Sequence, residues 1–309
     1  MKTIGFLNPY CSGSRGLKKW EKISSYFAKD IKWYRIDCNG SIDPIIKNSF
    51  LEGEINFIAA GGDGTVNYVL NKLLKLIPEE DLKNIKLGAA GIGSSNDFHK
   101  PFSECTIIEG IPVKTNFEAA EFRDIGCISF EEKGILRHKY FLINASIGIT
   151  AEANHFFNNP DLILKKLKKT NTGLSILYSA LKTILRYKNF DIRIKSAETG
   201  ELGVKLTNLG IVKNPNFSGN LRYNSVKKLN NGKFDIHLCY GMNMLEIINL
   251  FANLQKGSFY QIAKKRCWQS SEIKIFSNDD FYIEFDGEVI KTNSAAFKIL
   301  PRLIKVCSC

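Results

Sequence analysis

The chain of 309 residues is 44% hydrophobic and 24% charged, and its formal net charge is +12. This length is sufficient for two domains with large cores, and the ordinary composition excludes a mainly disordered chain. No apolar run approaches the ~20 residues of a membrane-spanning helix, and the positive charge favours anionic partners without separating nucleic acid, lipid headgroups and nucleotides.

The chain begins with a short apolar run, and the segment from Thr3 to Asn8 is predicted to be the first strand. The run from Ile4 to Leu7 is too short for the core of a signal peptide, so a cytoplasmic protein is expected. The eight cysteines contain no C-x-x-C pair, and the four histidines do not stand at metal-ligand spacing around them. We therefore expect reduced thiols rather than a disulfide framework or a zinc site.

Strand-like and helix-like segments alternate in the first part of the chain. The predicted strands are residues 3–8, 31–36, 55–60 and 86–90, and the predicted helices are residues 17–29, 42–51 and 65–77. In the third helix, one stripe is formed by Val66, Val69, Leu70, Leu73 and Leu74. This order predicts a mainly parallel sheet covered by helices, in which ligands bind beyond the carboxyl ends of the strands.

The pattern changes near Glu118, after which strands follow one another with few helices between them. Strands are expected at residues 122–130, 138–146, 190–196, 204–212, 234–240, 272–276, 281–285 and 296–300, and helices at 161–187, broken near Thr172-Gly173, and 244–254. Such a series is typical of a mostly antiparallel β-sandwich. We therefore predict an α/β domain at 1–121 and a β-rich domain at 122–296, with the tail 297–309 a candidate to return to the first domain.

Three loops rich in small residues follow predicted strands of the first domain. They read Asn8-Pro9-Tyr10-Cys11-Ser12-Gly13, Gly61-Gly62-Asp63-Gly64-Thr65-Val66-Asn67 and Gly91-Ile92-Gly93-Ser94-Ser95-Asn96-Asp97-Phe98. Polyphosphate oxygens require close backbone approach, which glycine permits, and amide donors at a helix N-terminus. A tight turn explains one such loop equally well, but three loops at one sheet edge predict a polyphosphate site.

Two of these loops carry an aspartate, Asp63 and Asp97. A carboxylate beside a phosphate group is repelled unless a cation lies between them, and Mg²⁺ is the usual cation. The alternative is structural, because Asp63, Asp97 or the neighbouring Asn96 can cap the helix that follows. The residues alone leave both interpretations open.

Taken together, the loops resemble those of the diacylglycerol kinase catalytic family, which includes bacterial lipid kinases and the sphingosine and ceramide kinases. The matching segments are NPYCSG at residues 8–13, GGDGTVNYVLN at 61–71, GSSNDF at 93–98, NASIG at 144–148, NNGKFDIH at 230–237 and FDGE at 285–288. They occur in the family's order over nearly the whole chain. The GGDGT loop alone is shared with NAD kinases and phosphofructokinases, whereas its combination with GSSNDF and DGE is specific to lipid kinases.

The resemblance implies an ATP-dependent lipid kinase with a first domain like that of NAD kinase or phosphofructokinase and an active site in the cleft between two domains. The implied ATP contacts are Asn8, Pro9, Ser12, Gly13, Gly61, Gly62, Asp63, Gly64, Thr65, Asn67, Gly93, Ser94, Ser95 and Asn96. The resemblance also implies that Asp63 binds Mg²⁺ and that Asp97 contacts it through water. It also makes Asp286 the general base that accepts the proton of an alcohol, with Glu288 in the same acidic cluster. A hairpin turn at Asp286-Gly287 is the local alternative.

Some positions depart from the family pattern. Tyr68 stands where the family usually has Glu, and Asp37-Cys38-Asn39-Gly40 lacks the usual threonine, so no ATP contact is assigned there. Bacterial members hold a structural Mg²⁺ with aspartates near Asn230-Asn231-Gly232, and the neutral Asn231 weakens that site. Tyr68 and Asn231 support the alternative of a non-catalytic nucleotide or lipid sensor, and the GGDGT loop permits an NAD kinase relative.

A lipid kinase has to reach a membrane surface, and two segments mix basic and apolar residues as interfacial surfaces do. These segments are Leu162–Lys169 and Lys256–Trp268, and the alternative for each is a solvated face. We expect a peripheral protein that docks reversibly on anionic lipid. No nucleic-acid partner is expected, because no recognition module supports one. A homodimer and the identity of the acceptor lipid stay open.

Overall fold

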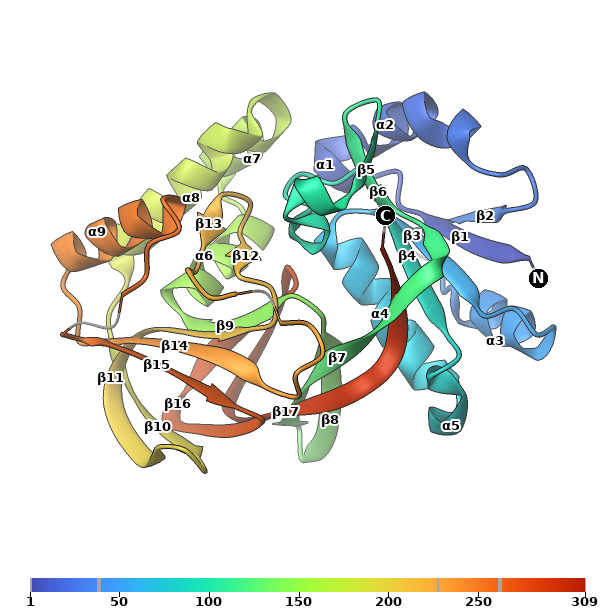
Figure 1. Cartoon of the computed structure of the whole chain (residues 1–309). Coiled ribbons are helices and arrows are strands. Elements are labelled where there is room, and N and C mark those ends of the chain that lie inside the picture. Colours follow the sequence, from blue (N-terminus) through green and yellow to red (C-terminus); the bar gives the residue numbers. More distant parts are fainter. Residues whose placement is uncertain (1, 38–39, 227, 261–262, 309) are drawn as a thin grey trace. The chain divides into compact units, whose positions relative to one another are not determined.

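The computed structural model describes residues 2–37, 40–226, 228–260 and 263–308. The chain forms two compact units: unit 1 comprises residues 1–125 and 301–309, and unit 2 comprises residues 126–300. Figure 1 labels the helices and strands of both units. The departure at Cys38-Asn39 lies outside the described residues. Within the described residues, no helix combines the length and apolar character needed to cross a bilayer.

Unit 1 alternates strands and helices. Its strands are β1 (Thr3–Leu7), β2 (Lys32–Arg35), β3 (Asn56–Gly61), β4 (Lys86–Gly91), β5 (Thr106–Ile108) and β6 (Ile111–Lys114). Its helices are α1 (Cys11–Ser14), α2 (Gly16–Ile23), α3 (Asp43–Leu51), α4 (Asp63–Leu76) and α5 (Glu79–Leu82), with short 3₁₀ turns η1 (Ser24–Tyr26), η2 (Asp97–His99) and η3 (Phe102–Glu104). Two long strands, β7 (Asn116–Glu132) and β17 (Glu288–Ser308), contribute to both units.

Parallel strands in the order β2-β1-β3-β4 form the centre of the unit 1 sheet. Beyond β4, the antiparallel β6 pairs with Ala89 and Ala90, while the end of β17 runs parallel to Lys86 and Leu87. Strands β1, β3 and β4 are almost entirely buried and apolar, as strands covered on both faces must be. The carboxyl ends of β1, β3 and β4 lead directly into the three glycine-rich loops.

The helices of unit 1 follow the predicted apolar stripes with shifted ends. Helix α4 buries the predicted Val66, Val69, Leu70 and Leu73, and it begins two residues earlier than predicted, at Asp63. The predicted helix at residues 17–29 instead ends at Ile23 and continues as η1. The change of direction lets Phe27 pack against Trp20 and Trp33, with ring centroids 5.2 and 5.3 Å apart. Aromatic packing therefore overrides the helical pattern there.

Unit 2 is rich in antiparallel strands. Its strands are β8 (Ile135–Phe141), β9 (Asn144–Gly148), β10 (Phe190–Ser196), β11 (Gly200–Val212), β12 (Asn216–Phe217), β13 (Leu221–Arg222), β14 (Phe234–Tyr240), β15 (Lys265–Ser270) and β16 (Glu272–Phe285). Its helices are α6 (Ile149–Asn158), α7 (Leu162–Thr170), α8 (Thr172–Arg186) and α9 (Met244–Gln255). The antiparallel order β15-β14-β11-β10-β16 encloses a large apolar core that includes Phe141, Phe234 and Phe297.

Two local predictions for unit 2 have clear outcomes, and one helix was not predicted. The strand predicted at 138–146 is interrupted between Phe141 and Asn144, because the backbone N–H groups of residues 142–144 bind a carboxylate instead of a neighbouring strand. Helix α6 was not predicted. The predicted break in the helix at 161–187 is confirmed at Asn171, whose side chain accepts a hydrogen bond from Leu174 N–H and so begins α8.

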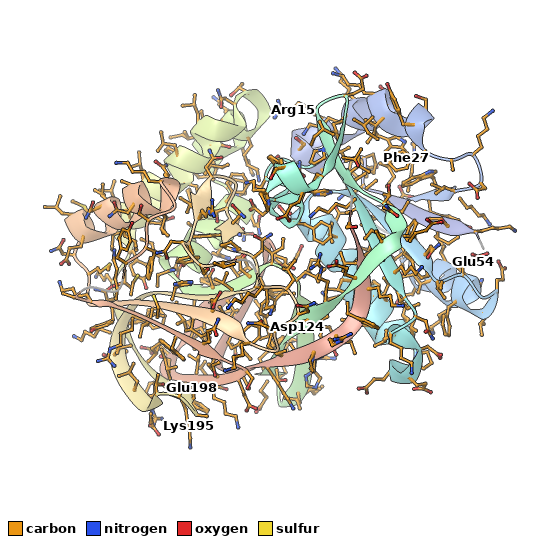
Figure 2. All side chains as sticks on the ribbon, in the orientation of Figure 1. Arg15, Phe27, Glu54, Asp124, Lys195 and Glu198 are labelled. Carbon is orange, nitrogen blue, oxygen red and sulfur yellow. The ribbon has the colours of Figure 1, made fainter. Side chains whose placement is uncertain are left out.

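Strand β17 bends where it enters unit 1. Arg302 has a left-handed φ of 51°, and its backbone N–H donates to the buried Asp124 Oδ1 over 3.2 Å. Its guanidinium group lies 5.0 Å from the centroid of the Phe122 ring. Figure 2 labels Asp124 among the side chains of the chain. These contacts fix the direction of the last residues, which pair with β4.

Candidate functional site

The side chain of Asn8, at the end of β1, links the first loop to the second. Its Nδ2 donates to Thr65 Oγ1 over 3.0 Å, and its Oδ1 accepts from the Tyr10 backbone N–H over 3.1 Å. The backbone then turns sharply, because Ser12 and Gly13 have left-handed φ angles of 56° and 64°. Turns of this kind bring backbone N–H groups into concave arrangements that suit anions.

The second and third loops approach each other backbone to backbone at Gly62 and Gly93. The Gly93 N–H donates to the Gly61 carbonyl oxygen over 3.1 Å. A Cβ atom added to Gly93 would lie 2.3 Å from the Gly62 Cα, a distance that real side chains do not reach. Glycine is therefore required here by the close approach of two chain segments.

Helix α4 begins directly at this contact. Gly62 is its N-cap residue, and the helix runs for 14 residues from Asp63. The N-terminus of an α-helix carries a partial positive charge and directs backbone N–H groups outward, so phosphate groups bind there. Thr65, in the first turn, is buried and receives the hydrogen bond from Asn8. The loops and the helix N-terminus form an arrangement suited to a polyphosphate.

The Asp63 carboxylate ties the second loop to the third. Its Oδ1 accepts from the Phe98 backbone N–H over 2.9 Å. The helix-cap alternative is wrong for α4, because the N-cap residue is Gly62. It is also wrong for the η2 turn, where Asn96 is the N-cap residue but makes no side-chain cap hydrogen bond. The Asp63 carboxylate instead accepts from an N–H of the η2 turn, and Asp97 is the first residue of that turn.

Asn96 and Asp97 have different surroundings. Asn96 has a left-handed φ of 52°, and its Nδ2 donates to the Gly91 carbonyl oxygen over 2.8 Å. The Asn96 Oδ1 is buried and has no hydrogen-bond partner among the described residues, which is costly and marks it as a candidate ligand for a bound cation or donor. Asp97 forms an ion pair with Lys100, with 2.7 Å between Oδ1 and Nζ.

Most other predicted ATP contacts lie on the same loops. Ser94 Oγ donates to Ser12 Oγ over 3.4 Å, which joins the third loop to the first. Asn67 is buried in α4 and accepts a hydrogen bond from Asn71 Nδ2 over 3.0 Å. The remaining predicted contacts in these loops are Pro9, Gly64 and Ser95.

Sequence reasoning missed Lys19, which lies in α2. Its Nζ donates to the Gly93 carbonyl oxygen over 2.6 Å, and burial lowers the pKa of its ammonium group. A lysine held against the third loop adds positive charge to the region that is suited to phosphate. Nothing in the helical pattern marked this residue, because Lys18 and Lys22 are similar in sequence context.

In unit 2, Asp286 lies in the two-residue turn between β16 and β17. Asp286 and Gly287 have φ angles of 45° and 93°, so the hairpin alternative is correct for the backbone. The carboxylate accepts three backbone hydrogen bonds, from Leu142 N–H to Oδ2 over 2.7 Å and from Ile143 and Asn144 N–H to Oδ1 over 3.0 and 3.1 Å. The turn thus places a buried carboxylate against the segment before β9.

A second buried carboxylate, Glu284, was also missed from sequence. It accepts from Ser146 Oγ over 2.7 Å, Asn144 Nδ2 over 3.3 Å and Gly287 N–H over 3.0 Å. Residue 284 lies next to the turn, but its side-chain partners Asn144 and Ser146 come from β9, more than a hundred residues earlier. Glu288 is exposed, although partial desolvation of its carboxylate raises its pKa.

The segment around Asn231 does not fit a structural Mg²⁺ in this chain. Lys213 is buried, and its Nζ donates to the Asn231 Oδ1 and to the Lys233 carbonyl oxygen, both over 2.9 Å. An ammonium group therefore already binds the oxygens that a divalent cation would need, and two cations cannot share them. The neutral Asn231 is consistent with a singly charged partner.

We expect Lys213→Ala to lower the free energy of unfolding by about 2 kcal/mol, because two buried oxygens lose a charged donor. For a domain of this size that corresponds to a fall of about 5 °C in Tm. EDTA should leave the Tm of the unaltered protein unchanged, and Lys195→Ala, at an exposed lysine, is the control. A fall in Tm on chelation that Mg²⁺ reverses would contradict the assignment.

The chain thus combines an α/β unit, with glycine-rich loops at the edge of a parallel sheet, and a unit rich in antiparallel strands. Residues 2–121 match the family profile "Diacylglycerol kinase catalytic domain", and residues 144–308 match "YegS C-terminal NAD kinase beta sandwich-like domain". The chain belongs to the diacylglycerol kinase catalytic-domain family, as the sequence motifs predicted.

Individual relatives agree with this membership. A diacylglycerol kinase from Bacillus subtilis (strain 168) is 24% identical over 252 residues, which cover 81% of this chain and 77% of that one. A crystal structure of a diacylglycerol kinase from Bacillus anthracis str. Sterne has the same fold, with a TM-score of 0.65 at 15% identity, covering 100% of this chain and 97% of that one. Another crystal structure from that organism gives a TM-score of 0.68 at 16% identity, with the same coverage.

The Tyr68 departure has a local explanation. The Lys72 Nζ lies 5.6 Å from the centroid of the Tyr68 ring, and it also forms an ion pair with Asp43 over 2.6 Å. Tyr68 therefore belongs to a side-chain cluster between α3 and α4.

Proposed function

We propose that this protein is an ATP-dependent lipid kinase that transfers the γ-phosphoryl group to a lipid hydroxyl, with diacylglycerol as the first acceptor to test. The observation that carries the proposal is the backbone contact of Gly62 with Gly93 at the N-terminus of α4, with the Asp63 carboxylate beside it. Membership in the diacylglycerol kinase family supports the kinase class, and the names of relatives suggest the acceptor.

In this proposal the residues of unit 1 hold the nucleotide. Backbone N–H groups of the first two loops and the N-terminus of α4 bind phosphate oxygens, and Lys19 adds positive charge. The carboxylate of Asp63 and the unpartnered Asn96 Oδ1 are hard oxygen donors of the kind that Mg²⁺ prefers. Mg²⁺ would offset the charge of the phosphate groups there, and Asp97 would contribute through water.

The residues of unit 2 act on the acceptor in this proposal. An alcohol is a weak nucleophile, so a carboxylate has to accept its proton as the phosphoryl group transfers. We assign that step to Asp286, whose orientation is fixed by three backbone N–H groups. Glu284 positions the same turn by accepting from the Gly287 N–H.

The direct test is turnover with labelled ATP and Mg²⁺ on mixed vesicles that contain diacylglycerol, monoacylglycerol, a sphingoid base or phosphatidylglycerol. Transfer of label to a lipid supports the proposal. Transfer to NAD instead would favour an NAD kinase relative, which the GGDGT loop also permits. ATP binding without transfer to any acceptor would favour the non-catalytic sensor.

Substitution of Gly93 tests the nucleotide site separately. We expect Gly93→Ala to weaken ATP binding at least tenfold in calorimetry, because its Cβ would lie 2.3 Å from Gly62 Cα and 2.8 Å from Asn96 Oδ1. Gly203→Ala, where an added Cβ meets no atom within 4 Å, is the control and should bind ATP normally. Unchanged ATP affinity in Gly93→Ala would contradict the placement of the nucleotide.

A further inference from the structure

Helix α8 exposes apolar side chains and buries polar ones, which is the reverse of an ordinary surface helix. Leu174, Leu177, Leu181 and Leu185 recur at helical spacing on one face, which we call the leucine face. All four side chains are exposed, with exposed fractions from 49% for Leu181 to 73% for Leu185. An amphipathic helix of a globular protein normally turns such a stripe towards the core. Four exposed leucines in one stripe therefore need an explanation.

The opposite face of α8 is buried although it is polar. Ser175, Ser179 and Thr183 follow one another at intervals of four residues, and all three are buried. The Ser179 hydroxyl donates to the Ala153 carbonyl oxygen of α6 over 3.0 Å. Small hydroxyl residues allow close packing of α8 on α6, as small residues do between closely packed helices. The leucine face points outward because the opposite face, with its hydroxyl residues, packs against α6.

The two neighbouring helices extend the apolar surface. Figure 1 shows α7, α8 and α9 along one edge of unit 2, and Ile184 of α8 shares a buried cluster with residues of α9. Helix α7 exposes Leu162 and Ile163, and α9 exposes Leu245 and Ile248. Together with the leucine face these residues form what we call the apolar helical surface.

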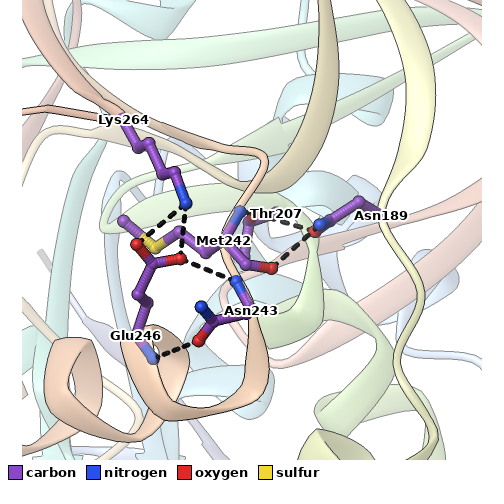
Figure 3. Close-up of polar contacts among 6 residues, drawn as sticks. All are labelled: Asn189, Thr207, Met242, Asn243, Glu246 and Lys264. Carbon is purple, nitrogen blue, oxygen red and sulfur yellow. Dashed lines mark hydrogen bonds and ion pairs between the residues drawn. The ribbon is translucent and has the colours of Figure 1, made fainter.

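The N-terminus of α9 is held firmly, so its exposed side chains are not those of a frayed end. Asn243 and Glu246 form a capping box, and the Glu246 carboxylate also accepts from Lys264 Nζ (Figure 3). Met242 N–H donates to Thr207 Oγ1 over 3.0 Å, and Asn189 Nδ2 donates to the Met242 carbonyl oxygen over 2.9 Å. The surface is therefore preformed.

The charged residues on and beside α7 and α8 are mostly basic, and the acidic Glu246 of α9 is paired with Lys264. Residues 161–190 contain seven Lys or Arg residues and one acidic residue, Asp161. Asp161 is already paired with Lys182. Lys165 and Lys166 of α7 and Arg186 of α8 are exposed. Apolar side chains flanked by cations complement a bilayer that carries anionic headgroups.

We propose that the apolar helical surface docks on an anionic lipid bilayer, with the leucine face inserted among the acyl chains and the lysines of α7 at the headgroups. The inference deepens the proposed function, on which it rests, by assigning the element that brings the enzyme to its substrate. The second interfacial segment predicted from sequence is only partly exposed, with Tyr260 and Arg266 at the surface. Within Lys256–Trp268, Phe259 and Lys265 are buried, and residues 261–262 lie outside the described residues.

The test is flotation with vesicles of phosphatidylcholine alone or with phosphatidylglycerol, without ATP. The triple variant Leu177→Ser, Leu181→Ser and Leu185→Ser is expected to bind anionic vesicles at least tenfold more weakly, because leucine insertion is lost. Leu51→Ser and Leu136→Ser, at leucines exposed elsewhere, are the matched controls and should bind normally. Lys165→Gln with Lys166→Gln should weaken binding to anionic vesicles only, against Lys195→Gln as control.

A fluorescent probe separates insertion from a general loss of folding. Leu181→Trp should show a blue shift and quenching by brominated acyl chains on adding anionic vesicles, whereas Leu136→Trp should show neither. Unchanged vesicle binding in the triple serine variant would overturn the proposal. So would a protein that is dimeric in solution, becomes monomeric in that variant and binds no vesicles, since a second copy would then cover the face. Vesicle binding without lipid phosphorylation would disprove the proposed function alone.

Discussion

Replacing Asp63 by asparagine is expected to lower kcat for lipid phosphorylation by about 10²–10³-fold, with little effect on Tm. The reason is that asparagine still offers an oxygen to the Phe98 N–H but no longer carries the charge that holds a cation against phosphate. Asp63→Ala, which also loses the hydrogen bond between the loops, should be no more active and less stable. Turnover across a Mg²⁺ titration measures the effect, and Asp63→Asn should require more Mg²⁺ for half-maximal rate.

A matched control exists in the same unit. Asp43 is also the first residue of a helix, but its carboxylate pairs with Lys72 and lies on α3 rather than on a glycine loop. Asp43→Asn should therefore retain kcat within about twofold, because its half-buried carboxylate pairs with Lys72 and is not part of a glycine loop. If Asp63→Asn and Asp43→Asn were equally active, the assignment of Asp63 to the metal would be wrong.

Replacing Asp286 by asparagine is expected to lower kcat by about 10²–10⁴-fold, the range for loss of a general base. Asparagine tolerates the left-handed φ of 45° at this turn, so the hairpin should persist. An amide can offer only one acceptor oxygen to the three backbone N–H groups of residues 142–144, which should cost about 1–3 kcal/mol of stability. Tm and kcat measured on the same preparation follow both effects.

The pH dependence distinguishes proton transfer from positioning. A base must be deprotonated to act, so the rate of the unaltered enzyme should fall at low pH, and that dependence should disappear in Asp286→Asn. Glu284→Gln is the matched control, since it perturbs the same turn through Gly287 and Ser146 but leaves Asp286 in place. We expect it to lose less than tenfold and to keep the pH profile. A residual activity of Asp286→Asn with an unchanged profile would make Asp286 a positioning residue.

Much of the secondary structure followed from periodicity, because it depends on neighbours in sequence. The apolar runs of β1, β3 and β4 and the stripe of α4 were predicted within two residues. The interruption at residues 142–143 was not predicted, because it depends on Asp286, more than 140 residues away. Helix α6 was missed for a similar reason, since Thr150 at its start is held by the Asn208 side chain of β11.

Which residues of the candidate site could be predicted also depends on whether the signal is local in sequence. Its loops were found because glycine, asparagine and aspartate at strand ends are visible as motifs. Lys19, Glu284 and Lys213 were not found, because each forms a hydrogen bond with a segment that is distant in sequence: the two lysines donate to carbonyl oxygens, and Glu284 accepts from the Ser146 hydroxyl. The exposure of the α8 leucines could not be predicted from sequence. The period of a helix predicts which residues share a face, but not whether that face is buried.

The pairing of β17 with β4 affects the order in which the two units can fold during synthesis. Residues 305 and 306 pair with β4, although the 175 residues of unit 2, from 126 to 300, are made between the two strands. Domains usually fold in the order in which they leave the ribosome. Unit 1 therefore completes its sheet only after residues 305 and 306 leave the ribosome, and until then Lys86 and Leu87 of β4 lack this neighbouring strand.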